Sequence, residues 1–252
     1  MKVSISDLAE KTNIKFGTSG LRGLVADMSD EVCFAYTQAF LQSIPIKDKR
    51  LVIGHDLRPS SPKIAQACCA AAEYLGIACI YIGAIPTPAL AYYCLKKKLP
   101  GIMVTGSHIP FNRNGIKFYR TEGEITKFDE EDIMNSQVNL HSQEYSKTLP
   151  SLDEEASHLY LKRYQDFFGS QSLSGKKIAI YEHSSVARDL IDELFKSLGA
   201  KTILLGRSDV FIPIDTEAIS EVDSKQAIQW AKKYSFDMLV STDGDADRPL
   251  IA

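Results

Sequence analysis

Short apolar runs alternate with longer stretches that carry apolar residues at helical spacing along most of the chain. This alternation predicts strands followed by helices, which is typical of α/β proteins. In the first half we expect strands at residues 51–54, 78–82, 101–105 and 116–119 and helices at residues 30–43, 62–75, 87–98 and 128–138. In the second half we expect strands at residues 177–182, 202–205 and 236–241 and helices at residues 153–168, 185–198 and 225–234.

Residues 139–153 interrupt this pattern, because they are polar, show no clear period and include Pro150. We expect a linker there and two domains, at residues 1–145 and 146–252. The length of 252 residues is sufficient for two domains of ordinary size. The predicted fold class is α/β, with two consecutive three-layer α/β/α domains and mixed, largely parallel sheets.

The charge and the cysteines narrow the class of protein. The net charge of −3 excludes a strong overall positive field for nucleic acid or an anionic membrane surface. No apolar run approaches the length of a membrane span, and the first residues are mixed polar rather than a secretory leader. The five cysteines lack metal-ligand or Cys-x-x-Cys spacing, which favours reduced thiols. We therefore expect a cytoplasmic protein with no nucleic-acid partner and no membrane partner.

Residues 105–119, TGSHIPFNRNGIKFY, follow one expected strand and run into the next. Residues that favour turns place Ser107 and His108 at the carboxyl end of a strand, where active sites of α/β proteins lie. Ser107 is a candidate nucleophile, and His108 and Lys117 are candidate proton carriers or charge partners. A plain turn with a capping serine and a surface histidine is the alternative. A hydrolase nucleophile elbow is excluded, because Gly106 directly precedes Ser107 and no glycine follows where one is needed.

Residues 15–23, KFGTSGLRG, form a glycine-rich loop whose backbone amides could hold a phosphate, with Arg22 as a fixed cation beside it. An ordinary glycine-rich turn is the alternative, and a Walker loop is excluded because no Lys-Ser/Thr pair follows the last glycine. In residues 55–62, HDLRPSSP, we expect Asp56 and Arg58 to form an ion pair that braces the loop.

Residues 242–248, TDGDADR, carry three aspartates at alternate positions directly after an expected buried strand. If Asp243, Asp245 and Asp247 converge to roughly 5 Å at an effective dielectric of about 20, each pair repels by about 3 kcal/mol and all three by about 10 kcal/mol. A divalent cation removes this repulsion, and carboxylate ligands indicate Mg²⁺ or another hard cation rather than Zn²⁺. An exposed acidic loop is the alternative. An EF-hand is excluded, because Arg248 stands where its glycine is required.

These stretches together resemble the motifs of the α-D-phosphohexomutases, the phosphomannomutase/phosphoglucomutase family. TGSHIPFNRNGIK is similar to the family's active-site serine motif, apart from Ile109 where Asn is common. KFGTSGLRG is similar to its N-terminal motif and DGDADR to its metal motif. The resemblance implies one Mg²⁺ per active site, held by Ser107, Asp243, Asp245 and Asp247. It also implies phosphate contacts from Arg22, Lys117 and Arg248.

Members of this family carry a phosphate on the motif serine, so the resemblance implies a phosphoserine at Ser107. Its phosphoryl group passes to a hexose phosphate and gives a hexose 1,6-bisphosphate. The bisphosphate turns round and returns its other phosphoryl group to the serine. The net reaction interconverts hexose 1- and 6-phosphates. The implied catalytic residues are Arg22, Ser107, His108 and Lys117. We expect Lys117 to move the proton of the sugar hydroxyl, which requires a lowered pKa, and His108 is the second candidate.

Full members of the family have four domains, and nothing in this chain matches the sugar-recognition and phosphate-clamping loops of the later two. We therefore expect an N-terminal two-domain portion, a poor mutase unless C-terminal domains are supplied in cis or in trans. One alternative is a phosphatase-like enzyme that uses Asp245 and Asp247 as nucleophile and acid, although Arg248-Pro249 lacks the expected hydroxyl. The other is a non-catalytic metal-binding fragment or subunit that needs a partner half.

Overall fold

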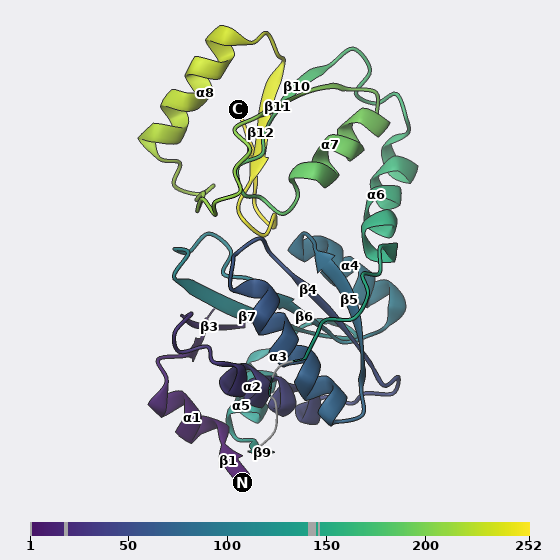
Figure 1. Ribbon diagram of the computed structural model, residues 1–252. Helices are drawn as coiled ribbons and strands as arrows, with labels where there is room; N and C mark the ends of the chain where they lie inside the picture. Colours follow the sequence, from purple (N-terminus) through teal and green to yellow (C-terminus); the bar gives the residue numbers. More distant parts are fainter. Residues whose placement is uncertain (1, 18–19, 141–144, 146) are drawn as a thin grey trace.

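A computed structural model describes residues 2–17, 20–140, 145 and 147–252, in which two main sheets have helices on both faces (Figure 1). The helices of the described residues are α1 (Ile5–Lys11), α2 (Asp30–Ser43), α3 (Ser61–Tyr74), α4 (Thr87–Lys97), α5 (Lys127–Met134), α6 (Glu155–Phe168), α7 (Arg188–Ser197) and α8 (Glu221–Lys233). Capping residues in the sequence determine where several of these helices begin. In α2, for example, the Ser29 side chain accepts a hydrogen bond from the Val32 amide, as an N-cap does.

The first sheet is built from β2 (Lys15–Phe16), β3 (Leu21–Leu24), β4 (Arg50–His55), β5 (Ala78–Ala84), β6 (Gly101–Val104), β7 (Arg113–Arg120) and β8 (Gly123–Glu124). Its strands lie in the order β2-β3-β7-β6-β4-β5, and β8 pairs with β7. The pairs β4–β5 and β4–β6 are parallel, whereas β6–β7, β7–β3 and β3–β2 are antiparallel. Because β4 and β6 run in the same direction, the loops that follow them leave from the same edge of the sheet.

Alternation along these strands divides the core between the two faces of the sheet. In β4, Leu51 and Ile53 pack in the core that α2 and α3 cover, whereas Val52 packs in the core that α4 covers. All three side chains are fully buried. The first sheet is therefore the middle layer of a three-layer unit.

The second sheet is built from β10 (Lys177–Tyr181), β11 (Lys201–Leu205), β12 (Met238–Thr242) and β13 (Pro249–Ile251), in the order β11-β10-β12-β13. Strand β10 is parallel to β11 and β12, and β13 is antiparallel to β12. Ile178 and Ile180 pack in the core with α7, and Ala179 packs with α8 on the opposite face. This second three-layer unit presents residues 243–248 as the turn between β12 and β13.

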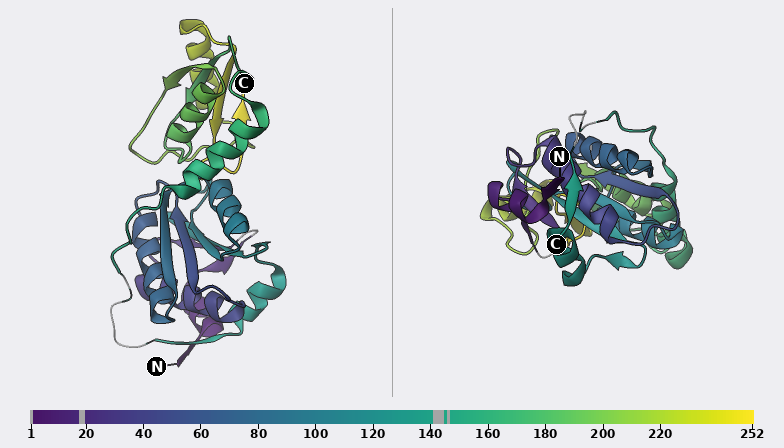
Figure 2. Two further views of the ribbon diagram at one scale, coloured as in Figure 1. Left: turned by 90° about the vertical axis from the view of Figure 1, so that its right-hand side faces the viewer. Right: turned by 90° about the horizontal axis from the view of Figure 1, so that it is seen from below.

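Helix α6 lies along the two units and packs against both (Figure 2). Tyr160 packs in a core with Tyr93 of α4, whereas Leu161 packs with Leu194 of α7. The helix thus contributes to the first unit as well, although the predicted domain 146–252 contains it. The domain boundary stays a prediction, and residues 141–144 and 146 of the expected linker lie outside the described residues.

The predicted α/β class is confirmed, with mixed, partly parallel sheets. The parallel pairs lie on one side of each sheet, in β6-β4-β5 of the first and β11-β10-β12 of the second. Residues 128–138 are not one helix as expected, because α5 ends at Met134 and β9 (Gln137–Asn139) pairs with β1 (Lys2–Ser4). Helices α7 and α8 begin at Arg188 and Glu221 rather than at 185 and 225. Residues 15–23 include the hairpin β2–β3, and residues 18–19 lie outside the described part.

None of the helices in the described residues combines the length and the apolar character needed to cross a membrane.

Candidate active site

The connection from β6 to β7 carries Ser107 in an uncommon backbone conformation. Its φ is 51°, in the left-handed region that residues other than glycine seldom adopt. The Ser107 amide donates to the Thr105 hydroxyl at 2.8 Å, and Oγ lies 3.2 Å from Nδ1 of His108. Because Ser107 is also buried, the turn holds its hydroxyl in a defined place. We call residues 105–112 the serine loop.

The guanidinium of Arg58 binds the backbone of the serine loop. Its Nε donates to Asp56, and Nη1 and Nη2 donate to the carbonyls of Ser107, Ile109, Pro110 and Arg113. These contacts use every N–H group of the guanidinium, and the side chain is fully buried. A rigid cation that meets carbonyls in fixed directions restricts the loop to one conformation.

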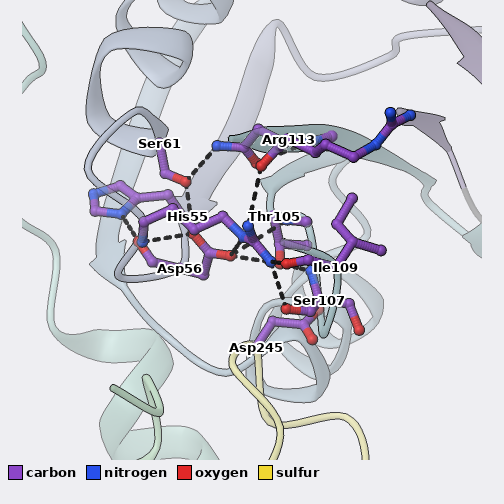
Figure 3. Close-up of polar contacts among 12 residues, drawn as sticks. His55, Asp56, Ser61, Thr105, Ser107, Ile109, Arg113 and Asp245 are labelled. Atoms are coloured by element: carbon purple, nitrogen blue, oxygen red, sulfur yellow. Dashed lines mark hydrogen bonds and ion pairs between the residues drawn. The ribbon is translucent and has the colours of Figure 1, made fainter. Parts of the chain in front are cut away.

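Asp56 is the second centre of this network (Figure 3). Its carboxylate accepts hydrogen bonds from the hydroxyls of Ser61 (2.6 Å) and Thr105 (2.8 Å) and from the Gly106 amide (3.3 Å). Burial raises the pKa of Asp56, while Arg58 and the hydrogen bonds act in the opposite direction. The predicted ion pair between Asp56 and Arg58 is confirmed at 3.2 Å, and it braces the serine loop in addition to its own loop.

The turn after β12, residues 243–248, brings three aspartates together; we call it the acidic turn. Asp243 and Asp245 are fully buried and Asp247 is partly exposed, and one oxygen from each lies within 4.8 Å of the others. Among the described residues, Oδ1 of Asp245 is buried without a hydrogen-bond partner. A buried carboxylate oxygen without a donor is costly, and a cation would satisfy it. The three aspartates therefore fit a metal site.

The serine loop and the acidic turn meet across the two units. The Ser107 hydroxyl donates to Oδ2 of Asp243 at 2.8 Å. Lys117 of β7 donates to Asp245 at 2.9 Å and to Asp247 at 2.7 Å. The structure thus brings together the candidate nucleophile, one candidate cation and the three candidate metal ligands.

Burial and the neighbouring carboxylate of Asp245 raise the pKa of Asp243 to about 7. Burial also acts to raise the pKa of Asp245, but Lys117 and Thr87 outweigh it and lower that pKa. For Lys117, burial acts to lower the pKa, but Asp245 and Asp247 outweigh it and raise the pKa. The lowered pKa expected of a proton-moving Lys117 is therefore not found, because two carboxylates hold its charge.

Arg22 and Arg248 are the two arginines that we expect to bind phosphate. Arg22 pairs with Gly115 across β3 and β7, so it shares a face of the sheet with Lys117, two positions further along. The Arg248 guanidinium forms an ion pair with Glu217 at 3.1 Å. Within the described part of the chain neither guanidinium makes a hydrogen bond to Ser107, and the phosphate-binding roles of both stay predictions.

Sequence reasoning missed two residues that touch the site. The Thr87 hydroxyl donates to Oδ2 of Asp245 at 2.6 Å, and the Thr87 amide donates to the Asp245 carbonyl at 2.9 Å. Phe211 lies over Arg58, with Cζ of the guanidinium 4.2 Å from the ring centroid. From the sequence, Thr87 is expected only to begin the helix at residues 87–98, and Phe211 belongs to no motif.

Comparisons with known proteins agree with this geometry. The family model for "Phosphoglucomutase/phosphomannomutase, alpha/beta/alpha domain I" matches residues 13–144. A phosphomannomutase of Salmonella muenchen is 50% identical over 248 residues, which are 98% of this chain and 52% of that protein. A phosphomannomutase of Sinorhizobium fredii is 42% identical over 247 residues, which are 94% of this chain and 52% of that protein. The chain spans about half the length of these curated relatives.

Two crystal structures share the fold. A phosphoglucomutase/phosphomannomutase family protein of Burkholderia thailandensis has a TM-score of 0.76 at 19% identity, over 99% of this chain and 55% of that one. A phosphomannomutase-like protein of Thermus thermophilus has a TM-score of 0.72 at 21% identity, over 95% of this chain and 56% of that one. At such identities the likeness shows the fold alone. The family model, however, spans more than half of the chain and includes the serine loop, so the chain belongs to the phosphoglucomutase/phosphomannomutase family.

Proposed function

We propose that the chain is the part of a phosphohexomutase that carries the phosphorylated serine and the metal site. Such an enzyme interconverts hexose 1- and 6-phosphates through a hexose 1,6-bisphosphate. The observation that carries the proposal is the 2.8 Å hydrogen bond from Ser107 Oγ to Asp243 Oδ2, because it joins the candidate phosphoryl carrier to the candidate metal ligands. The similarity to two phosphomannomutases supports the reaction class.

One Mg²⁺ would be held by Asp243, Asp245 and Asp247 together with an oxygen on Ser107. The buried, unpartnered Oδ1 of Asp245 and the set of oxygen donors support this hard cation. When bound, Mg²⁺ supplies positive charge that offsets the carboxylates and polarises the oxygens of a serine phosphate.

In the proposed first step, the phosphoryl group of phosphoserine 107 bonds to a hydroxyl oxygen of the hexose phosphate as its bond to Oγ breaks. The hydroxyl proton passes to a base, which returns it to Oγ so that the serine leaves as a hydroxyl. We assign that base to His108, whose Nδ1 lies 3.2 Å from Oγ, because Lys117 is held as a cation. Lys117, Arg22 and Arg248 then offset the charge of the moving phosphoryl group. The bisphosphate turns, and its other phosphoryl group bonds to Oγ as its bond to the sugar oxygen breaks, while the Oγ proton passes through the same base to that oxygen.

Further domains are part of this proposal, because the chain spans about half the length of its curated relatives. In cis or in trans, they would hold the far phosphate of the hexose phosphate and so supply binding energy remote from the reacting group. We also infer that the chain divides into domains 1–145 and 146–252 and that it acts on free sugar phosphates in the cytoplasm.

A single-turnover reaction tests the proposal. The purified chain is mixed with an equimolar amount of glucose 1,6-bisphosphate and excess Mg²⁺ and is followed by phosphorus NMR. We expect the bisphosphate to become a hexose monophosphate while a phosphoryl group appears on the protein, and Ser107→Ala should leave the bisphosphate intact. An intact bisphosphate with the unsubstituted chain, together with tight Mg²⁺ binding, would favour a non-catalytic metal-binding subunit that needs a partner half.

Mg²⁺ binding is expected to weaken as the pH falls below about 7, because the raised pKa of Asp243 leaves a proton on this carboxyl. That proton must leave before the cation binds. The affinity should therefore fall by up to about tenfold per pH unit on the acid side and level off above the pKa. Isothermal titration calorimetry in buffers of different protonation enthalpy measures both the affinity and the released proton. Equal affinities on both sides of the pKa, without proton release, would contradict this expectation.

A further inference from the structure

Phe211 of the second unit covers the guanidinium of Arg58 in the first. Cζ of Arg58 lies 4.2 Å from the ring centroid, and Phe211 is only 7% exposed. Because every N–H group of the guanidinium already points to an oxygen acceptor, the ring meets a face of the cation rather than its edge. This is the geometry of a cation–π contact, which is stronger when it is shielded from water.

The same ring also packs against the acidic turn. A Cβ on Gly244 would lie 3.1 Å from Cε2 and Cζ of Phe211 and 3.0 Å from the carbonyl oxygen of Ser107. The Gly244 backbone therefore fits closely between the ring and the serine loop. The segment that carries Phe211 is fixed by Ser184, whose hydroxyl accepts from the Ile212 amide at 2.7 Å.

We propose that Phe211 is a positioning residue that acts on Ser107 through Arg58. When the second unit docks, the ring fixes the guanidinium, and the guanidinium fixes the carbonyls of the serine loop, including that of Ser107. The Ser107 hydroxyl also donates to Asp243 of the acidic turn, so the docked second unit fixes the phosphoryl carrier and the metal site together. The inference rests on the proposed function for its catalytic consequence, but not for the contacts themselves.

Hydrogen–deuterium exchange of Phe211→Leu and Phe211→Met tests this inference. Both variants keep an apolar side chain against Gly244 but lose the aromatic face, and Met adapts to the space available. With Mg²⁺ present, we expect amide exchange in residues 105–113 to become about tenfold faster. Exchange in β10 and β12 should stay as in the unsubstituted chain. Val210→Ala is the matched control, because Val210 is the neighbouring residue and is 76% exposed, and it should change neither region.

The rate of Ser107 phosphorylation by glucose 1,6-bisphosphate is a second readout. At saturating bisphosphate this rate should fall by about tenfold in both Phe211 variants, with the half-saturating concentration and the Mg²⁺ affinity within about twofold. If the proposed function fails, the unsubstituted chain stays unphosphorylated while the exchange effect persists. If the present inference fails, the unsubstituted chain is phosphorylated while the exchange effect is missing.

Two results would overturn the role of Phe211. Unchanged exchange in residues 105–113 of both variants would mean that the ring does not hold Arg58. Faster exchange in residues 243–248 together with weaker Mg²⁺ binding would mean that Phe211 acts through Gly244 and the acidic turn rather than through Arg58.

Discussion

Replacing Arg58 by Met is expected to lower the free energy of unfolding by about 3–5 kcal/mol. The change removes the cation beside Asp56 and leaves a buried carboxylate without its partner. It also removes the donors to three backbone carbonyls of the serine loop and to the neighbouring carbonyl of Arg113. Urea unfolding of the variant and of the unsubstituted chain, monitored by circular dichroism, measures the difference.

The chain contains a matched control for this prediction in Arg50. Asp48 and Arg50 form an ion pair with the same sequence spacing as Asp56 and Arg58, but their side chains are 46% and 51% exposed. Exposed ion pairs contribute little to stability, so the midpoint of urea unfolding of Arg50→Met should equal that of the unsubstituted chain. If Arg58→Met and Arg50→Met unfold at the same urea concentration, the buried network of Asp56 and Arg58 does not stabilise the serine loop.

Replacing Asp245 by Asn is expected to reduce Mg²⁺ affinity by about 100-fold, because it removes the charge of the most enclosed carboxylate. Asp245 is fully buried, and its Oδ1 has no donor among the described residues. The rate of Ser107 phosphorylation should fall by about 100-fold to 1000-fold, since charge stabilisation is the main contribution to phosphoryl transfer. Calorimetry and a quenched time course with glucose 1,6-bisphosphate measure the two quantities.

Asp209→Asn is the control for Asp245→Asn. Asp209 is a carboxylate of the same unit whose side chain is fully exposed, so the substitution changes the net charge equally without touching the acidic turn. It should leave both the Mg²⁺ affinity and the phosphorylation rate unchanged. Equal losses in both variants would show that net charge, rather than a metal site, governs the measurements.

The strands that deliver the site could be predicted from the sequence alone. Strands β6 and β12 are buried on both faces, so they show no alternation, but each is a short apolar run that ends at turn residues, and this length and these flanks predict a strand. From them it followed that Ser107 and the three aspartates lie on loops at the carboxyl ends of strands. Short strands such as β2, β9 and β13 could not be found in this way, because two or three residues show no period.

The meeting of the two loops could not be predicted from local pattern. Ser107 and Asp243 are 136 positions apart in the sequence. The pattern of apolar residues does not indicate which loop of one sheet faces which loop of the other. The resemblance to a known family supplied that pairing. The direction of the pKa shift of Lys117 could not be predicted for the same reason, because it depends on Asp245 and Asp247, which belong to the other unit. Thr87 and Phe211 act as single residues without any motif.

The intact mass of the purified chain, taken with and without glucose 1,6-bisphosphate and Mg²⁺ and followed by peptide mapping, shows directly whether Ser107 carries a phosphoryl group. We expect one added phosphoryl group, located on Ser107 and missing from Ser107→Ala. A chain that gains no phosphoryl group under either condition, or that gains one at another residue, would contradict the claim that Ser107 is the phosphoryl carrier.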